Sequence, residues 1–276
     1  MIIIKRLALI LAVVAIGCFV VSAIVLTMNG VNTGELRFLH FWSSEKTDYN
    51  DLDDVSFENA YNIIDFETLN INVVSANTEF IVEDRSDVKI MYTGKGKFSV
   101  NTNNDELNVV ESFKGLNVFS TGSGSLIIYV PKDFYKDLKL NSVSGEIEFG
   151  KLKSDNLIIN SVSGNIDLTN IVSKEVRIKT VSGSIEVTDF SFNSFSSTTI
   201  SGNAKIYALD EWSNIKATSV SGKVSVYVTE NSKPVIKYNS ISGDLKSDLG
   251  TNGSDNSTQT ITVNTTSGDL VVKINK

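Results

Sequence analysis

The chain has 276 residues with 25 basic and 32 acidic side chains, a net charge of −7, and only one cysteine and one histidine. This acidic balance argues against a nucleic-acid-binding protein, because such proteins gather basic side chains on one surface. The cysteine, Cys18, lies in an N-terminal apolar run. The rest of the chain therefore has no disulfide and no thiolate metal site.

The N-terminus predicts a membrane anchor. Lys5 and Arg6 precede an uncharged apolar run from Leu7 to Leu26. Such a run, at about 1.5 Å per residue, is about 30 Å long and matches the hydrocarbon core of a bilayer. We therefore expect residues 1–30 to hold a cytoplasmic N-terminus and one transmembrane helix in contact with lipid. The charge bias predicts that everything after the anchor is extracytoplasmic.

Two alternatives to an uncleaved anchor stay open. Residues 21–23, Val-Ser-Ala, resemble a signal-peptidase site. Residues 15–18, Ala-Ile-Gly-Cys, resemble a lipoprotein box in which Cys18 would carry the lipid. The apolar run continues to Leu26, which favours the spanning helix over both.

Residues 31–67 are expected to form a juxtamembrane stem. Residues 36–42 are aromatic and include His40 and Trp42, which suits the membrane interface. The following stretch, 45–67, is acidic, and we predict a short helix over residues 54–64.

Residues 68–276 are predicted to form a β ectodomain, whose first part, 68–137, is irregular. Alternating apolar and polar residues predict strands near 69–73, 87–90, 106–109 and 126–130. Gly124 lies 21 residues before Gly145 and marks a degenerate repeat. We expect this section to form the N-terminal end of the same β domain and to cover the open edge of the first regular coil.

A four-residue signature, mostly Ser/Thr-Val/Ile-Ser-Gly, repeats through residues 138–276. Its glycines are 19, 19, 19, 20, 21 and 25 residues apart. A period near twenty with β-rich content predicts an all-β, single-stack β-solenoid of about seven coils. Each glycine is expected to form a corner that needs positive φ or a close backbone approach. These repeat-turn glycines are Gly145, Gly164, Gly183, Gly202, Gly222, Gly243 and Gly268.

The repeat also predicts a core. Positions seven before, two after and four after each glycine are apolar, and only Ser247 breaks the pattern. In-register stacking at about 4.8 Å would turn these positions into buried columns. The serine before each glycine, from Ser144 to Ser267, would form either a hydrogen-bonded stripe or a corner packed with small residues.

Near the C-terminus we expect an exposed loop and an open edge strand. Residues 247–258 hold the excess of the longest spacing and are expected to bulge from one coil as an exposed loop. The last strand, near residues 269–274, should be an open edge, since no coil follows it. An open edge invites weak self-association or a strand from a partner.

The sequence contains few candidate catalytic or metal-binding side chains. His40 is the only histidine, so the solenoid has no Ser-His-Asp or multi-histidine site. Glu148, Asp167 and Glu186 share one outward column. That column is interpreted as a solvated strand face, with a cation site or sugar hydrolysis by paired carboxylates as alternatives. We therefore expect no enzyme, no metal and no cofactor.

Residues 130–134, Val-Pro-Lys-Asp-Phe, followed by repeated Val-Ser-Gly-x-Ile motifs behind an anchor, resemble the bacterial putative adhesin domain family. The resemblance covers roughly residues 64–274. It implies a membrane-anchored β-solenoid of unassigned function, with relatives linked to envelope stress. We therefore expect a cell-envelope protein presenting a non-catalytic surface for adhesion, binding or scaffolding, with a glycan or membrane protein as partner. The alternatives are an accessory regulator of an envelope-stress system and a carbohydrate-active enzyme.

Overall fold

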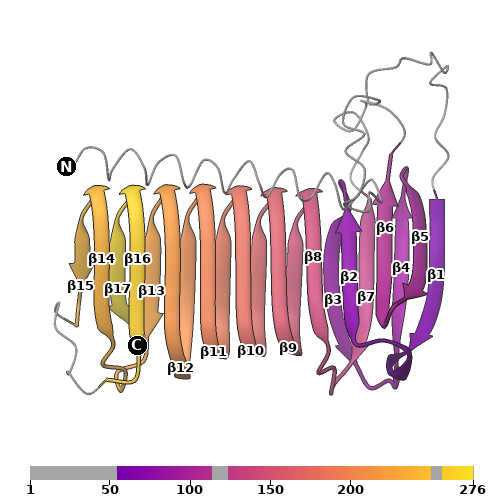
Figure 1. Ribbon diagram of the computed structural model, residues 1–276, viewed down its shortest axis with the longest axis horizontal. Coiled ribbons are helices and arrows are strands. Elements are labelled where there is room, and N and C mark those ends of the chain that lie inside the picture. Colours follow the sequence, from indigo (N-terminus) through magenta and orange to yellow (C-terminus); the bar gives the residue numbers. More distant parts are fainter. Residues whose placement is uncertain (1–54, 114–123, 250–256, 276) are drawn as a thin grey trace, which may run out of the picture.

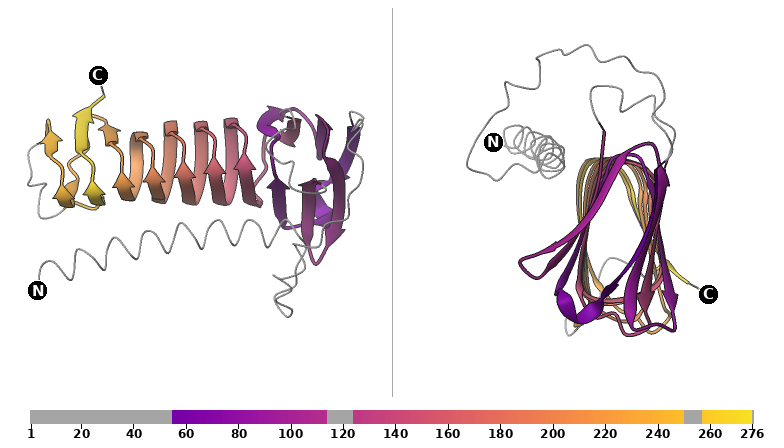
Figure 2. Two further views of the ribbon diagram at one scale, coloured as in Figure 1. Left: turned by 90° about the horizontal axis from the view of Figure 1, so that it is seen from above. Right: turned by 90° about the vertical axis from the view of Figure 1, so that its right-hand side faces the viewer.

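The computed structural model describes residues 55–113, 124–249 and 257–275. They form a rod in which strands stack side by side along one axis (Figure 1). Viewed along that axis, two sheet faces enclose a narrow core (Figure 2). Apart from one 3-10 turn, η1 (Ile63–Asp65), the described residues contain no helix. The predicted all-β fold class is confirmed.

The predicted anchor, its two alternatives, Cys18 and His40 all lie outside the described residues. Within the ranges described here, no helix is long and apolar enough to cross a bilayer.

The helix predicted over residues 54–64 is wrong. Residues Val55–Asn62 form strand β1, which pairs antiparallel with β4 (Asp87–Gly94). Phe57 and Tyr61 pack against the core while the residues around them are exposed. A spacing of four fits one face of a helix and also one face of a strand. The free edge of β4 decides between them, and the β structure begins before Thr68.

The middle of the rod is regular. Its four longest strands pair in parallel, with Ile147, Ile166, Ile185 and Ala204 side by side. Each strand leaves one glycine corner, bends at a second corner and reaches the next glycine. The predicted buried columns are confirmed, since Ile166 and Ile185 are at most 1% exposed. These strands are β9 (Ile147–Ser163), β10 (Ile166–Ser182), β11 (Ile185–Ser201) and β12 (Ala204–Ser221).

The second corner was not predicted from the sequence. Lys151, Asn170 and Asp189, each six residues after a glycine, have φ near +55° (57°, 55° and 53°). Asparagine and aspartate tolerate this left-handed conformation better than most residues. Lysine does not share that tolerance, so the stacked neighbours rather than local preference hold Lys151 in it.

Glycines stack directly on glycines at the first corner. Gly164 has φ +117°, and a Cβ there would overlap the carbonyl oxygen of Gly145. The same contact links Gly268 to Gly222, and Gly243 to Gly268. All seven repeat-turn glycines lie in this row, in the order Gly145, Gly164, Gly183, Gly202, Gly222, Gly268 and Gly243.

That order departs from the sequence at the C-terminal end. The last repeat, β16 (Thr260–Ser267) and β17 (Leu270–Ile274), pairs with β12 and with β13 (Val224–Val228). On its other side it pairs with the preceding repeat, β14 (Val235–Ser242) and β15 (Leu245–Ser247). The prediction that the last strand is the open edge is therefore wrong, since β17 has a partner on both sides and the outermost coil is β14–β15 (Figure 1).

The hydrophobic effect explains this exchange. Ile261, Val263, Leu270 and Val272 of the last repeat are fully buried, whereas Ile236 and Leu245 of the outer coil are only partly buried. Burying one such side chain contributes about 1.5–3 kcal/mol. The repeat that Ser247 interrupts therefore suits the end of the stack. There Tyr238 donates a hydrogen bond of 2.7 Å from its hydroxyl to the carbonyl of Gly268.

The connection predicted as a bulge is a return link. It joins β15 to β16, so it carries the chain back by one coil. Its central residues, 250–256, lie outside the described ranges.

The N-terminal end also departs from sequence order. The first coil, β2 (Thr68–Val73) and β3 (Asn77–Glu83), lies between two later coils. One of these is β8 (Asp137–Ser144) with β9. The other is β6 (Glu106–Ser112) with β7 (Ser125–Pro131), in which Gly124 occupies the glycine corner.

Antiparallel strands close this end. β4 pairs with β7, and β5 (Lys97–Asn103) pairs with β6. Aromatic rings pack between them, with Phe98 stacked on Tyr92 at 4.2 Å and 5.0 Å from Phe57. The irregular section therefore forms the capped end of the same stack.

A buried carboxylate organises that capped end. Glu111 is fully buried, and its Oε2 accepts hydrogen bonds from the backbone N–H groups of Val74, Ser75 and Ala76 at 2.8, 2.9 and 3.1 Å. Its Oε1 accepts a bond of 2.9 Å from the hydroxyl of Tyr92. The three amides belong to the corner between β2 and β3, so Glu111 satisfies a corner that has no regular coil on its outer side.

We predict that Glu111→Ala is among the most damaging substitutions in this rod. It leaves three buried N–H donors and one hydroxyl without an acceptor, and each such donor costs about 1–3 kcal/mol. The free energy of unfolding should fall by at least about 3 kcal/mol, measured by denaturant titration of the full chain. Glu106→Ala, at the half-buried start of the same strand, is the matched control. Equal effects of the two changes would contradict this role.

Candidate functional site

The predicted carboxylate column is present. Asp167 is paired with Glu148 on one side and Glu186 on the other, and Lys205 follows Glu186. The Lys205 Nζ lies 3.0 Å from the Glu186 Oε2. Glu79 of β3 extends the column beyond Glu148. The repeat pattern missed Glu79, because the β2–β3 coil lacks the Ser-Gly signature.

Burial and the neighbouring negative charges in this column both act on the pKa of Asp167. Partial burial raises the pKa of Asp167, and the negative charges of Glu186, Glu148 and Glu146 raise it further. Lys205 acts in the opposite direction but is the smallest of these influences. Burial and the stacked like charges therefore destabilise the charged form of Asp167.

Among the described residues, this column shows no group of side chains typical of a metal centre. Across residues 55–113, 124–249 and 257–275, no three histidine, cysteine, aspartate or glutamate side chains lie close enough together to hold a metal ion. The cation alternative for Glu148, Asp167 and Glu186 is therefore not supported.

The serine before each glycine does not form the corner's main hydrogen bonds. Ser163, Ser182, Ser201 and Ser221 are exposed. The first hydroxyl of the signature is buried, and in two coils it bonds the carbonyl two residues on, from Ser161 to Ser163 and from Thr180 to Ser182, both at 3.1 Å. The equivalent hydroxyls of Ser142, Thr199 and Ser219 are buried without such a bond. The two bonded hydroxyls support the turn, so their role is structural.

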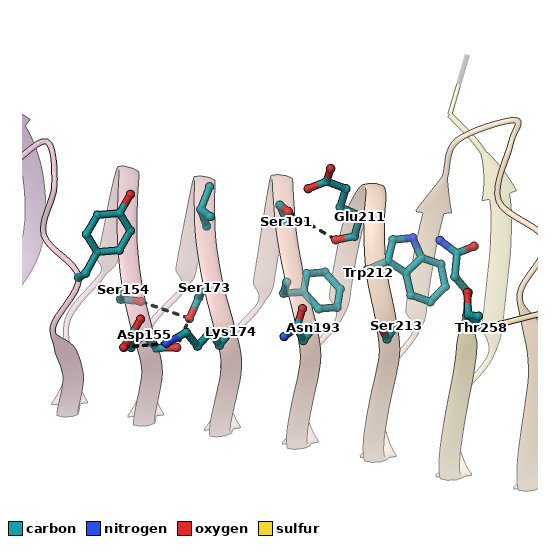
Figure 3. Close-up of a pocket in the computed structure, with 14 residues that line it drawn as sticks. Ser154, Asp155, Ser173, Lys174, Ser191, Asn193, Glu211, Trp212, Ser213 and Thr258 are labelled. Atoms are coloured by element: carbon teal, nitrogen blue, oxygen red, sulfur yellow. Dashed lines mark hydrogen bonds and ion pairs between the residues drawn. The ribbon is translucent and has the colours of Figure 1, made fainter.

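A groove of about 540 Å³ follows the second corner of the regular coils. Figure 3 shows its lining residues in successive coils along the rod, with Ser154, Ser173 and Trp212 among those labelled. The groove therefore runs along the stack axis, across the strands.

Small side chains open this groove. Ser154 and Ser173 are paired positions in neighbouring coils, and their hydroxyls lie 3.3 Å apart. The next two coils place Phe192 and Trp212 at the same position. The groove is thus open beside the two serines and is bounded by the two aromatic rings further along the stack.

The aromatic wall coincides with an irregular coil. Gly202 and Gly222 are 20 residues apart, where the preceding spacings are 19. The register between β11 and β12 shifts here, so that Phe190 pairs with Ala208 but Phe192 with Trp212. This bulge leaves Leu209 43% exposed beside Glu211.

Exposed apolar side chains gather along the same corner. Tyr135 is 53% exposed at one end of the groove, and Val172 is 49% exposed within it. The Lys153 Nζ lies 5.3 Å from the centre of the Tyr135 ring and 3.1 Å from its hydroxyl. A cation over the ring fixes the orientation of Tyr135.

The polar lining is close to neutral. The Asp155 carboxylate lies 2.9 Å from the Lys174 Nζ, and Glu211 adds one further negative charge. Asn193 and Ser213 contribute neutral hydrogen-bonding groups. Apolar patches flanked by a few polar groups are typical of ligand-binding surfaces.

The fold is a capped single-stack β-solenoid with a long groove along one corner. A family model described as Toastrack DUF4097 matches residues 66–211, more than half of the chain. The chain belongs to this family, which confirms the resemblance drawn from the Val-Ser-Gly motifs.

Solved structures with similar folds cover most of the chain at low identity. An adhesin-like protein from Bacteroides fragilis, named a putative adhesin, is 11% identical, with a TM-score of 0.47 over 80% of this chain and 97% of that one. A protein from Parabacteroides distasonis named a putative lipid binding protein is 16% identical, with a TM-score of 0.45 over 81% and 97%. No match is found among functionally curated proteins.

We predict that Asp167→Asn stabilises the protein at neutral pH. The folded state raises the pKa of Asp167, so the folded protein binds this proton more tightly and loses stability as pH rises through that range. The gain at pH 7 should reach at most about 0.5 kcal/mol, because the side chain is on the surface. It should vanish below about pH 3.9, where the carboxyl is protonated in both states.

Thermal unfolding at a series of pH values measures this difference. Asp133→Asn is the control, because the Asp133 carboxylate lies 3.3 Å from the Lys153 Nζ and gains nothing from losing its charge. A wild-type protein that is as stable as Asp167→Asn at every pH would refute the repulsion.

Proposed function

We propose that the chain is a membrane-anchored protein of the cell envelope whose solenoid presents a non-catalytic binding surface. The groove along the second corner carries this proposal. It is the place where exposed apolar side chains and polar groups from several coils converge. The names of similar structures, adhesin-like and lipid-binding, agree with a role in binding.

The side chains present favour binding over catalysis. The single histidine and the single cysteine both precede the described residues. The carboxylate column consists of neighbouring acids of like charge on an exposed face, and the Asp155 carboxylate in the groove is paired with Lys174. Neither arrangement places two free carboxyl groups on opposite sides of a cleft, where they could flank the scissile bond as glycoside hydrolysis requires.

We predict that blocking the groove abolishes binding to envelope material. Val172→Arg places a long side chain at an exposed groove position, and the surface location should leave the fold intact. Ile64→Arg is the matched control, since Ile64 is 77% exposed outside the groove. Co-sedimentation of the detergent-solubilised full chain with envelope material freed of membrane lipid measures binding, so that the anchor does not contribute. Val172→Arg should lose it and Ile64→Arg should retain it, whereas equal binding by both variants would remove the groove from the function.

The proposed location follows from Lys5, Arg6 and the apolar run after them. Protease added to intact protoplasts should digest the chain beyond Gly30. Complete protection of that region would contradict an extracytoplasmic solenoid.

We also propose that the coil β14–β15 supports weak self-association. Among the described residues, nothing pairs with the outer edge of β14, and Ile236 and Tyr238 of that coil are only partly buried. A second copy related by a two-fold axis would pair β14 antiparallel with its own copy. The opposite end already accepts antiparallel strands, on β6 and β7.

Sedimentation velocity over a range of concentrations tests this association. Ile241→Lys adds a charge to β14 and should reduce the apparent mass at high concentration, while Thr262→Lys on the internal strand β16 should not. A monomer at every concentration for the unmodified chain would contradict self-association.

A further inference from the structure

The groove has features that identify its ligand class, and this inference rests on the binding function proposed above. Two exposed apolar side chains line it. Tyr135 precedes β8, and Val172 lies two coils further in β10. Two coil spacings are about 9.6 Å (2 × 4.8 Å). That distance is on the scale of a disaccharide in an extended chain.

Polar side chains occupy the coils on both sides of Val172. Lys153 and Ser191 are the register partners of Val172 on either side. Asp155 and Lys174 line one side of the groove, and Glu211 lies near its aromatic wall. A sugar ring has an apolar face of C–H groups and a rim of hydroxyls. Alternating apolar and hydrogen-bonding positions suit such a ring.

An extended peptide fits this corner less well. Strand addition needs a free sheet edge with unpaired backbone groups. The strands β10 and β11, which cross the middle of the groove, are paired on both sides. In β9 only residues 151–156 pair with neither β3 nor β8, a stretch that runs across the stack axis and not along it. A peptide lying along the stack axis would find no backbone ladder to join.

Polyanions and acyl chains also fit poorly. Asp155 and Glu211 contribute two carboxylates against the single Lys174 ammonium in the middle of the groove. This lining therefore offers a phosphate polymer no excess of positive charge to bind. An acyl chain needs an enclosed apolar surface, whereas this groove alternates apolar and charged side chains.

We propose that the groove binds a neutral glycan chain lying along the stack axis, with sugar faces over Tyr135 and Val172. Tyr135 would provide the stacking platform, held in place by Lys153. Asp155, Asn193 and Glu211 would bond the sugar hydroxyls along the groove. A longer glycan would then cross more coils and contact more groove residues.

Isothermal titration of the detergent-solubilised full chain tests this assignment. The probes are a neutral β-1,4-linked N-acetylglucosamine hexamer, a polyol-phosphate polymer and an extended neutral peptide. We expect the hexamer to bind and the dimer of the same sugar to bind at least about tenfold more weakly, because it reaches only one platform. The other two probes should not bind.

Two pairs of variants locate the binding. Tyr135→Ala should weaken hexamer binding by about tenfold, whereas Tyr135→Phe should change it less than about twofold, because the ring stacks and the hydroxyl does not. Val172→Asp should weaken it similarly, and Ile64→Asp should have no effect. Circular dichroism and thermal unfolding confirm that each variant is folded.

The outcomes separate this inference from the proposed function. No binding of the hexamer at millimolar concentration, or binding that Tyr135→Ala and Val172→Asp leave unchanged, overturns the glycan assignment. Preferential binding of the peptide or the polyol phosphate overturns it as well. If Val172→Arg still abolishes binding to envelopes in either case, the groove keeps its function and only the ligand class is wrong.

Discussion

Direct contact between backbones at the glycine corner is the constraint on which this rod depends. Parallel strands in register repeat every 4.8 Å or so, and the chain must turn sharply at the same height in every coil. A Cβ on Gly164 would overlap the carbonyl oxygen of Gly145, so the corner admits only glycine. Once this row is closed, the positions two and four residues later fall into the core, and Ile166 stacks on Ile147 and Ile185. The opposite corner bears no such contact, which leaves it free to vary and to form the groove.

The two ends of the stack solve one problem in different ways. A terminal coil exposes half of its core, and the coils are placed so that the most apolar ones avoid the ends. At the C-terminal end the fully apolar last repeat moves inward, and the repeat interrupted by Ser247 takes the outside. At the N-terminal end antiparallel strands with Phe57, Tyr92 and Phe98 close the core, and Glu111 accepts hydrogen bonds from the buried corner amides.

The repeat itself was predictable because the spacing of the glycines gives its period and corners, and the apolar positions around each glycine give its core. The order of the coils was not, since Leu270 and Leu245 fit equally well beside Val224 in a column of apolar residues. One local sign of the exchange was Ser247, which interrupts the apolar column of its repeat. It indicates the outer position only because the less apolar repeat loses less by leaving one side of its core uncovered. Glu111 could not be found, because its partners at Val74–Ala76 are brought to it only by the exchanged coils. The groove had a trace in the spacing of 20 at Gly222, but its shape depends on Ser154 and Ser173 standing beside Phe192 and Trp212.

Disulfide trapping tests the exchanged order most directly. In a Cys18→Ser background, cysteines at Lys216 and Thr262 occupy paired positions of β12 and β16, one coil spacing apart. Cysteines at Lys216 and Lys237 would be neighbours if the coils followed the sequence, but Lys237 pairs with Thr262 and so lies two spacings away. Disulfides require Cα atoms within about 7 Å, which one spacing of about 4.8 Å satisfies and two do not. Mild oxidation should cross-link Lys216→Cys with Thr262→Cys and leave Lys216→Cys with Lys237→Cys reduced. Efficient cross-linking of the second pair but not the first would contradict the exchange.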